Sequence, residues 1–365
     1  MLLRARFAIA LVLAVPAVGA TADTLRVPAD FPTIQAAVDA AGPGDVIDVA
    51  KGTYDESVVI SGKTQIALRG KAKPTIDGGD AALPLRIESS DGITVDGLVL
   101  ANGLEDDLEI VGSNNVVIRR CELDGGALDG IGVDDSTNVL IEKNHFERQG
   151  DDGIDFDQEE GPVTHARISK NRFERVSDDA IDLDGSEHLV EKNRARRCGT
   201  GIHVEEGSSG NTLEKNTIED SDDTAIAIEG SDNHVVKNKI RRAGDEGISV
   251  HGDGNRVESN KIDRADDEAL DVEGNDNEFF SNQGTNSGGN GVEVGEANAP
   301  GAATGNLFDH NKIAGSSENG FLVRDTGNTF RANNASKSGG FDLLDETIPG
   351  GNVYENNHFG TQQLP

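Results

Sequence analysis

The sequence lacks tryptophan altogether, and aromatic residues make up only 4% of its 365 positions. A conventional core packed with large aromatic side chains is therefore not expected. Basic residues are scarce too, because 33 Lys and Arg stand against 66 Asp and Glu and give a formal net charge of -33. Nucleic-acid binding requires a basic face that contacts the phosphates, so this charge excludes it.

A long apolar run is also missing. The apolar stretch Phe7–Val15 is too short to cross a bilayer, so we expect no membrane span. It follows Arg4 and Arg6 and precedes the small residues Ala20–Ala22, an arrangement typical of a secretory signal peptide. The sequence therefore predicts a signal peptide over residues 1–22 and a secreted or periplasmic location. We expect residues 23–365 to form one acidic, monomeric domain.

An internal repeat dominates the rest of the chain. The pattern apolar-x-x-Asn-x-apolar, as in IEKNHF at 141–146, recurs to the end of the sequence, and successive anchor positions are 22 to 29 residues apart. Such regular spacing indicates a stacked repeat architecture. The anchors are Cys121, Asn144, Asn171, Asn193, Asn216, Asn238, Asn260, Asn282, Asn311, Asn333 and Asn356.

Each repeat carries a second short run, in which Gly or Ala precedes an apolar-x-apolar triplet, as in GIDFD at 153 and AIDLD at 180. Runs this short with period two are typical of strands, and Gly, Asn, Asp and Ser separate them. No repeat has room for a helix, which excludes leucine-rich and ankyrin-type units. The pattern predicts an all-β fold, a single-stranded parallel β-helix with coils of roughly 22 residues.

Stacked coils should bury their inward residues against one another at roughly 4.8 Å, the spacing of neighbouring strands. One predicted interior column contains Ile141, Ile168, Val190, Leu213, Val235 and Val257. The other contains Ile154, Ile181, Ile202, Ile226, Ile248 and Leu270. Cys121 and Cys198 lie three coils apart, roughly 14 Å at this spacing, whereas a disulfide needs Cα atoms within about 7 Å. We therefore expect two free thiols.

A short helix is expected ahead of the coils. The segment 32–41 places Ile34, Ala37 and Val38 on one face, and Asp30 would cap its N-terminus. Such a helix would cover the unpaired strand edges of the first coil.

The Asn column has two interpretations. A side-chain amide in a tight turn can bond its own coil and the identical Asn above and below it. A column of exposed amides could instead bind sugar hydroxyls. The apolar residues on both sides of each Asn point inward, which favours the structural interpretation.

The segment DFPTIQAAVDAAGPGDVIDVAKGTYDESVVI at 30–60, together with the Asn repeats, resembles the right-handed parallel β-helix superfamily. Its members include pectate lyases, polygalacturonases, pectin methylesterases, alginate epimerases and carbohydrate-binding β-helix proteins. The resemblance covers essentially all of residues 23–365 and implies a right-handed β-helix with a short N-terminal capping helix. It also implies a polysaccharide partner, although the activity has to be argued from a site.

A row of outward residues lies in the second strand of each repeat, between its two apolar residues. Insertions at Asp157–Pro162 and Gly295–Thr304 follow this same strand, and loops gathered on one face often mark a binding face. We therefore expect a groove along this row. The row contains Glu109, Gly132, Asp155, Asp182, His203, Ala227, Ser249, Asp271 and Glu293.

The candidate catalytic residues lie in this row. Asp155 and Asp182 would be roughly 5 Å apart on adjacent coils, and like charges at that distance raise the pKa of one carboxyl. One aspartate could then be a general acid beside an ionised carboxylate. His203 could carry the proton as a base near neutral pH, with Asp152 and Asp179 in support.

The same two carboxylates, Asp155 and Asp182, would suit Ca²⁺, which prefers oxygen ligands. A calcium ion would also let an acidic protein bind an acidic polymer, and no other cofactor is expected. Alternatively, the acidic residues keep a long β surface soluble. A further row of acidic turn residues, such as Asp151 and Asp152, follows Arg148 and its equivalents Arg175, Arg197, Arg242 and Arg264, which suggests ladders of surface ion pairs.

Comparison with the enzyme families leaves catalysis open. In polygalacturonases, successive coils carry Asn-Thr-Asp, Gly-Asp-Asp and Gly-His-Gly. Here Asp152, Asp178 and Asp179 match the acidic positions, but Thr200 stands where the His should be. The Arg-Ile-Lys run of polygalacturonases is absent, and so is the Asp-Pro-His-Asp run of alginate epimerases. Two hypotheses remain: a lyase, hydrolase or C5-epimerase of a polysaccharide, foremost a uronate-containing one, or a non-catalytic carbohydrate-binding or surface scaffold protein.

Overall fold

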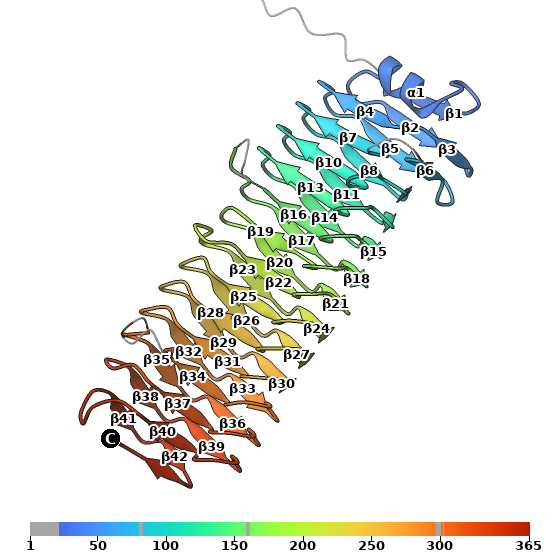
Figure 1. Cartoon of the computed structure of the whole chain (residues 1–365). Helices are drawn as coiled ribbons and strands as arrows, with labels where there is room; N and C mark the ends of the chain where they lie inside the picture. Colours follow the sequence, from blue (N-terminus) through green and yellow to red (C-terminus); the bar gives the residue numbers. More distant parts are fainter. Residues whose placement is uncertain (1–21, 80–82, 158–160, 297–300, 302) are drawn as a thin grey trace, which may run out of the picture.

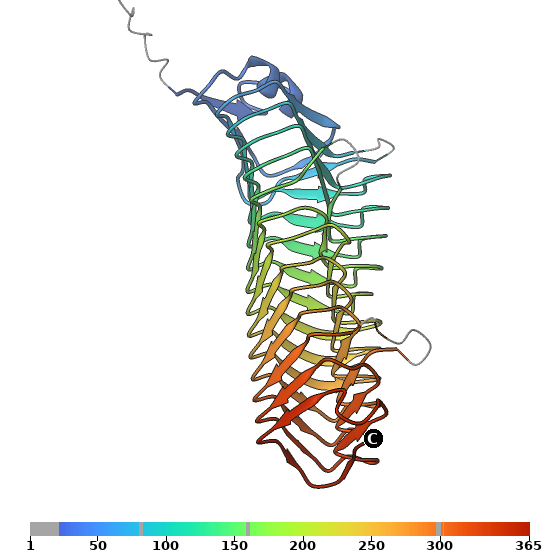
Figure 2. The ribbon, with the colours of Figure 1, turned by 90° about the vertical axis from the view of Figure 1, so that its left-hand side faces the viewer.

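The computed structural model describes residues 22–79, 83–157, 161–296, 301 and 303–365. The chain winds into an elongated stack of coils, with a helix at one end and the C-terminus at the other (Figures 1 and 2). The predicted parallel β-helix is confirmed. Residues 1–21 of the predicted signal peptide lie outside the described residues. Within the described residues, no helix is both long enough and apolar enough to cross a membrane.

The coils form three parallel sheets, named A, B and C in the following paragraphs, and each complete coil adds one strand to each sheet. A strand therefore pairs with strands three positions before and after it in the chain, as β16 does with β13 and β19. Residues about one coil apart in sequence thus become neighbours across the stack.

Sheet A has 15 strands and holds the apolar residues that precede the Asn anchors. Its strands are β1 (Thr24–Val27), β2 (Val46–Val49), β5 (Ala67–Gly70), β8 (Thr94–Asp96), β11 (Val117–Arg119), β14 (Leu140–Glu142), β17 (Arg167–Ser169), β20 (Leu189–Glu191), β23 (Thr212–Glu214), β26 (His234–Val236), β29 (Arg256–Glu258), β32 (Glu278–Phe280), β35 (Leu307–Asp309), β38 (Thr329–Arg331) and β41 (Val353–Glu355).

Sheet B has 14 strands and directly follows the anchors. Its strands are β3 (Thr53–Asp55), β6 (Thr75–Asp77), β9 (Val99–Ala101), β12 (Glu122–Asp124), β15 (His145–Glu147), β18 (Arg172–Glu174), β21 (Arg194–Arg196), β24 (Thr217–Ser221), β27 (Lys239–Ala243), β30 (Lys261–Ala265), β33 (Gln283–Thr285), β36 (Lys312–Ala314), β39 (Asn334–Ser336) and β42 (His358–Phe359).

Sheet C has 14 strands and carries the row of outward residues. Its strands are β4 (Val58–Ser61), β7 (Leu85–Glu88), β10 (Leu108–Val111), β13 (Ile131–Asp134), β16 (Ile154–Phe156), β19 (Asp182–Leu183), β22 (Ile202–Val204), β25 (Ile226–Ile228), β28 (Ile248–Val250), β31 (Leu270–Val272), β34 (Val292–Val294), β37 (Phe321–Val323), β40 (Leu343–Asp345) and β43 (Gln362–Gln363).

Both predicted interior columns are confirmed. In sheet A, Ile141 pairs with Ile168 and Ile168 with Val190, and all three side chains are fully buried. Aliphatic side chains fill most of the interior, with stacks of Phe at a few levels, such as Phe146 on Phe173 with ring centroids 4.6 Å apart. A stack of thin coils thus builds a continuous core from few aromatic residues.

The predictions for the two cysteines are confirmed, because Cys121 and Cys198 are both free and buried. The N-terminal helix is confirmed as α1 (Ile34–Ala40), but the predicted cap is wrong. Thr33 caps the helix by accepting a hydrogen bond from the Ala36 N–H at 3.1 Å. Asp30 lies too early in the chain and accepts from the Arg26 N–H instead.

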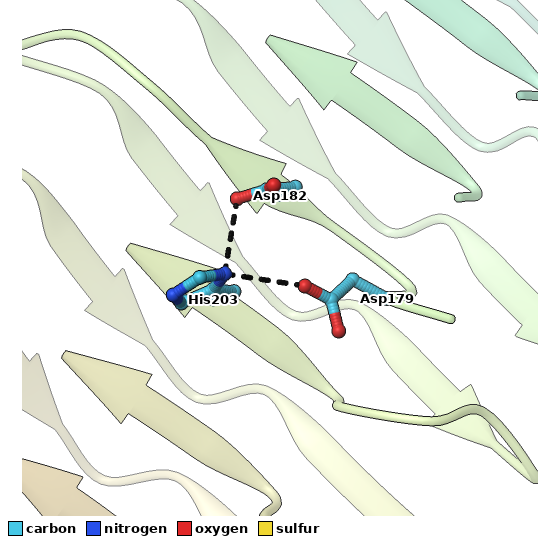
Figure 3. A group of neighbouring side chains, drawn as sticks. All are labelled: Asp179, Asp182 and His203. Atoms are coloured by element: carbon cyan, nitrogen blue, oxygen red, sulfur yellow. Dashed lines mark ion pairs between the residues drawn. The ribbon is translucent and has the colours of Figure 1, made fainter. Parts of the chain in front are cut away.

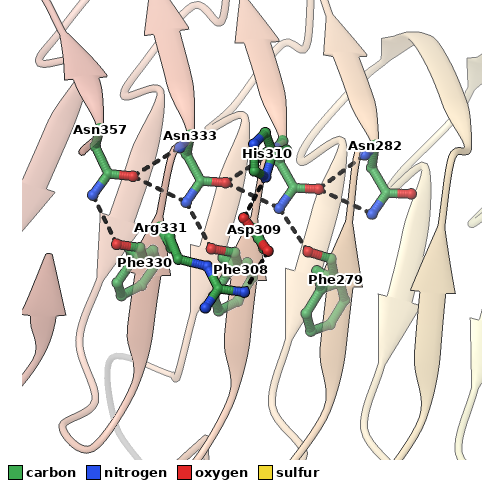
Figure 4. A network of polar contacts seen from close by, with 10 residues as sticks. Phe279, Asn282, Phe308, Asp309, His310, Phe330, Arg331, Asn333 and Asn357 are labelled. Atoms are coloured by element: carbon green, nitrogen blue, oxygen red, sulfur yellow. Dashed lines mark hydrogen bonds and ion pairs between the residues drawn. The ribbon is translucent and has the colours of Figure 1, made fainter. Parts of the chain in front are cut away.

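The Asn column forms a buried hydrogen-bond ladder (Figure 4). Each amide accepts from the backbone N–H of the preceding anchor and donates to a carbonyl of an earlier coil. Asn238, for example, accepts from the Asn216 N–H and donates to the Leu213 carbonyl, both at 2.8 Å. The last anchor is Asn357 rather than the predicted Asn356, since Asn357 accepts from the Asn333 N–H. Burial of these amides favours the structural interpretation.

The predicted ion-pair ladder exists with different partners. Among the residues that the structure describes, no ion pair joins these arginines to the acidic turn residues that follow them. Arg148 pairs with Asp124 and Arg175 with Glu147, at the end of the preceding coil's strand in sheet B. The two insertions, Asp157–Pro162 and Gly295–Thr304, lie partly outside the described residues. They follow β16 and β34, which both belong to sheet C.

Candidate functional site

Sheet C brings the predicted site residues of the outward row together. Asp155 on β16 pairs with Asp182 on β19, and Asp182 pairs with His203 on β22. The side chains between the apolar residues of these strands point away from the core, so three consecutive coils present two carboxylates and one imidazole. The predicted register of these three residues is confirmed.

Asp152 and Asp179 approach the same place from the turns that lead from sheet B into sheet C. The carboxylate of Asp152 accepts a hydrogen bond from the Asp179 N–H at 2.7 Å. Asp129 accepts from the Asp152 N–H at 2.8 Å in the same way, and Asp106 from the Asp129 N–H at 3.2 Å. These four aspartates form an Asp ladder that ends at the site. We call Asp152, Asp155, Asp179, Asp182 and His203 the acid cluster.

His203 lies among carboxylates on both sides of its ring. Its Nδ1 is 3.4 Å from Asp179 Oδ2 and 3.5 Å from Asp182 Oδ1 (Figure 3). Glu205 Oε1 lies 3.5 Å from the same nitrogen, and Glu229 Oε1 lies 3.7 Å from Nε2. Burial disfavours the imidazolium, but the hydrogen bond to Asp179 and the charge of Asp182 outweigh it and raise the pKa of His203 to about 9. This pKa favours the charged form of the ring at neutral pH, and the role of His203 as a base stays a prediction.

Three carboxyl groups of the cluster, those of Asp152, Asp155 and Asp182, have raised pKa values. Burial, followed by the charge of Asp179, raises the pKa of Asp152 to about 9. Burial and the charges of Asp129 and Asp182 raise the pKa of Asp155 to about 8. Burial raises the pKa of Asp182 to about 7, although the charge of His203 opposes this. Near neutral pH, Asp152 and Asp155 thus favour their protonated forms, and Asp182 is close to half ionised.

The spacing of the cluster also suits a cation. One carboxylate oxygen each from Asp152, Asp155 and Asp182 lie within 4.8 Å of one another. The oxygen and nitrogen atoms of Asp179, Asp182 and His203 form a second such group. An all-oxygen set of the first kind matches the preference of Ca²⁺. A bound cation would take the place of the protons that these neighbouring carboxyl groups otherwise hold.

Sequence analysis missed four carboxylates that complete the site. Asp106 and Asp129 extend the Asp ladder, and Glu205 and Glu229 face His203. The signal for the first two was present, because the steps from Asp106 to Asp129 and to Asp152 are both 23 residues. Glu205 and Glu229 lie just after their strands, where the direction of a side chain is set by the turn that follows.

Comparisons with known proteins support the fold. Residues 45–166 and 161–306 match the family described as the right handed beta helix region. Comparison with curated protein sequences gives no match.

Among solved structures, the chain is similar to the A-module of the mannuronan C-5 epimerase AlgE6 of Azotobacter vinelandii. The TM-score is 0.64 at 14% identity, over 91% of this chain and 94% of that one. A mannuronic acid specific polysaccharide family 6 lyase from human gut microbiota gives a TM-score of 0.62 at 17% identity, over 86% of both chains.

The surface adhesin PfbA of Streptococcus pneumoniae gives a TM-score of 0.54 at 14% identity, over 91% of this chain and 93% of that one. At these identities the similarity concerns the fold. The family match covers well over half of the sequence, and the chain therefore belongs to the right-handed β-helix family.

Proposed function

We propose that the protein binds a polysaccharide and cleaves it by acid–base chemistry at the acid cluster. Proteins with this fold include, by their names, a mannuronan C-5 epimerase and a polysaccharide lyase, so a role on a polysaccharide fits the fold. The observation that carries the proposal is the convergence of Asp152, Asp155 and Asp182 within 4.8 Å beside a charged His203.

Hydrolysis suits this arrangement best. Cleavage of a glycosidic bond needs one carboxylic acid that protonates the leaving oxygen and one carboxylate that acts as base or nucleophile. Asp155, with its pKa raised to about 8, keeps the proton to donate. Asp182, with a pKa of about 7 and opposite His203, is ionised often enough to act as the nucleophile. Its carboxylate oxygen lies within 4.8 Å of an oxygen of Asp155, which leaves no room for the water that a base would activate. In the second step water replaces Asp182 on the sugar carbon and gives a proton back to Asp155, while His203 supplies the compensating positive charge.

Elimination and C5-epimerisation fit less well. Both begin with removal of a proton from a sugar carbon, which requires a basic group that is deprotonated at neutral pH. The carboxylates around His203 favour its charged form, which suits that role poorly. A uronate-containing substrate stays a prediction, and uronates are part of the test below.

A calcium ion at Asp155 and Asp182 is a second proposal for the same cluster. The close carboxylate oxygens of Asp152, Asp155 and Asp182 fit a hard cation. Bound there, the ion would supply charge neutralisation for an acidic group of the substrate. Calcium binding should raise the unfolding temperature in proportion to the logarithm of its concentration, and the substitution Asp155→Asn should remove this increase.

The test of cleavage uses the full chain and a panel of pectate, polygalacturonate, alginate, chondroitin and neutral glucans, with and without Ca²⁺. New reducing ends report hydrolysis, and the ultraviolet absorbance of unsaturated products reports elimination. The substitutions Asp155→Asn and Asp182→Asn should each lower hydrolysis by a factor of about 10² or more. Asp266→Asn, at an exposed turn residue outside the cluster, is the matched control.

The competing function is a non-catalytic binding or surface scaffold protein, like the adhesin that shares this fold. The low aromatic content, 4% of the chain, favours it, since sugar-binding sites often use aromatic side chains. Binding to a polysaccharide without new reducing ends or unsaturated products would establish this function and remove the catalytic roles. Export of the protein is also proposed, from the N-terminal pattern, and N-terminal sequencing of the protein recovered from the producing cell tests it.

A further inference from the structure

A hollow of about 340 Å³ lies next to the acid cluster, towards the N-terminal end of the stack. Its size is at the lower end of the range of about 300–1,000 Å³ that is usual for small-ligand sites. Asp155 belongs both to its wall and to the acid cluster, so anything bound in the hollow would lie beside the reacting groups. The lining includes Asp106, Glu109, Leu128, Asp129, Gly132 and Asp155.

A glycine opens this hollow. Gly132 lies in the outward row between Glu109 and Asp155, where neighbouring coils carry acidic side chains. A Cβ atom at Gly132 would lie 2.8 Å from Asp106 Oδ2, which is too close for a side chain without movement of that carboxylate. The missing side chain therefore leaves a gap in an otherwise continuous row of side chains.

An exposed leucine forms one wall. Leu128 has 46% of its surface exposed, and among the described residues before Phe341 only Leu104 is a second exposed large apolar side chain. The Leu128 carbonyl accepts hydrogen bonds from the N–H groups of Gly150 and Asp151 at 3.1 and 3.2 Å. Leu128 is thereby held one coil away from the turn that carries Asp152.

The charges around the hollow select against an acidic ligand. No Lys or Arg of the described chain lines it. Arg86 pairs with Glu109 of the wall, and it is also paired with Glu88. A uronate carboxylate placed here would find no basic side chain to pair with, and it would lie near Asp129, whose pKa of about 6 leaves it largely ionised at neutral pH. Sugar hydroxyls, in contrast, can donate hydrogen bonds to Asp129 and accept one from the protonated carboxyl of Asp155.

We propose that this hollow is a binding subsite for an uncharged pyranose residue of the polysaccharide. The apolar face of the ring packs on Leu128, and its hydroxyls form hydrogen bonds with the surrounding carboxyl groups. The inference builds on the proposed function and adds the class of sugar bound beside Asp155.

Binding of defined hexasaccharides tests the subsite. Cellohexaose and laminarihexaose are the uncharged probes, and hexamannuronate and hexagalacturonate are the acidic ones. Calorimetry is performed on the full chain carrying Asp179→Asn, which removes a carboxylate of the cluster without altering the lining of the hollow. The added substitutions are Leu128→Ala and Gly132→Val, with Leu104→Ala as the matched control on an exposed leucine of the neighbouring turn.

At least one uncharged hexasaccharide should bind, and Leu128→Ala and Gly132→Val should each raise its dissociation constant about tenfold. Leu104→Ala should leave it unchanged. Binding of only the acidic probes, binding of no uncharged probe, or equal binding by all variants would overturn the proposal. Because Leu128 is exposed, its variant should keep the fold even if Gly132→Val does not, and circular dichroism checks both.

The outcomes separate the subsite from the proposed function. If no polysaccharide is cleaved but the uncharged probe binds with this dependence on Leu128, the subsite stands and catalysis fails. If polysaccharide is hydrolysed and Leu128→Ala changes neither binding nor cleavage, catalysis stands and the subsite fails.

Discussion

Replacing Asp155 by Asn should stabilise the protein at neutral pH and leave its stability at acidic pH unchanged. Burial and the charges of Asp129 and Asp182 raise the pKa of Asp155 from 3.8 to about 8. The folded chain therefore keeps a proton that the unfolded chain releases above pH 4. Protonated Asp155 makes its full contribution to the unfolding free energy below the pKa of the unfolded chain. That contribution is lost as the pH rises towards the pKa of the folded chain.

The size of the effect follows from the pKa difference. Each unit corresponds to about 1.4 kcal/mol, so holding the proton from 3.8 up to pH 7 costs about 4 kcal/mol of unfolding free energy. The neighbouring carboxyls titrate together with Asp155 and share this cost, so we expect a gain of about 2 kcal/mol for Asp155→Asn near pH 7. Asparagine is uncharged at every pH, and near pH 4 the gain should fall below about 0.5 kcal/mol.

Unfolding in urea, followed by circular dichroism at both pH values, measures the difference. The exposed Asp266→Asn variant should behave like the parent protein at each pH. An Asp155→Asn variant that is no more stable than the parent near pH 7 would refute the reasoning. An equal gain at both pH values would refute it too. Such a gain would come from improved packing, which does not depend on protonation, and not from the removal of a titrating carboxyl. A variant that is more stable than the parent but inactive would show that Asp155 lowers stability for the sake of activity.

Three further predictions concern the framework. Asn238→Ala should lower the unfolding free energy by about 3 kcal/mol, because buried N–H and C=O groups lose their partners, while Asn334→Ala at an exposed position of β39 should cost little in the same urea titration. Thr33→Ala should cost about 1 kcal/mol by loss of the helix cap, and hydrogen exchange in α1 should accelerate. Burial raises the pKa of Cys121 to about 11 and of Cys198 to about 12, so a thiol reagent at neutral pH should react with either only after denaturation.

The fold could be read from the sequence because its signals repeat. Alternation around Ile154 and Ile181 gives strands, and the steps between Asn anchors place them in register. The predictions were wrong at two positions near the ends of the chain, where no repeat defines the position of a residue. The helix cap moved from Asp30 to Thr33, and the last anchor from Asn356 to Asn357, because a single residue's position there depends on local turn geometry.

The positions of the site residues on neighbouring coils could be predicted from the sequence, but their side-chain contacts could not. Stacking alone brought Asp155, Asp182 and His203 together, and the sequence contains that information. The raised pKa of His203 was not predictable, because it depends first on a hydrogen bond to Asp179 and on the distance to Asp182, and the sequence does not give side-chain geometry. The partners of the arginines were missed for a similar reason, since a long side chain reaches across to the preceding coil.

The chain itself provides the comparison that separates structure from function at the acid cluster. The turn position of Asp152 recurs two residues before each strand of sheet C, and in later coils it holds Asn290 and Asn319. There the Asn290 amide oxygen accepts from the Asn319 N–H at 3.1 Å, the same bond that Asp152 makes to the Asp179 N–H. An uncharged amide therefore satisfies the backbone at this position. The Asp residues make the same bond but destabilise the fold by crowding carboxyl groups together. This destabilisation is explained if the protons or cations that they hold are used in function.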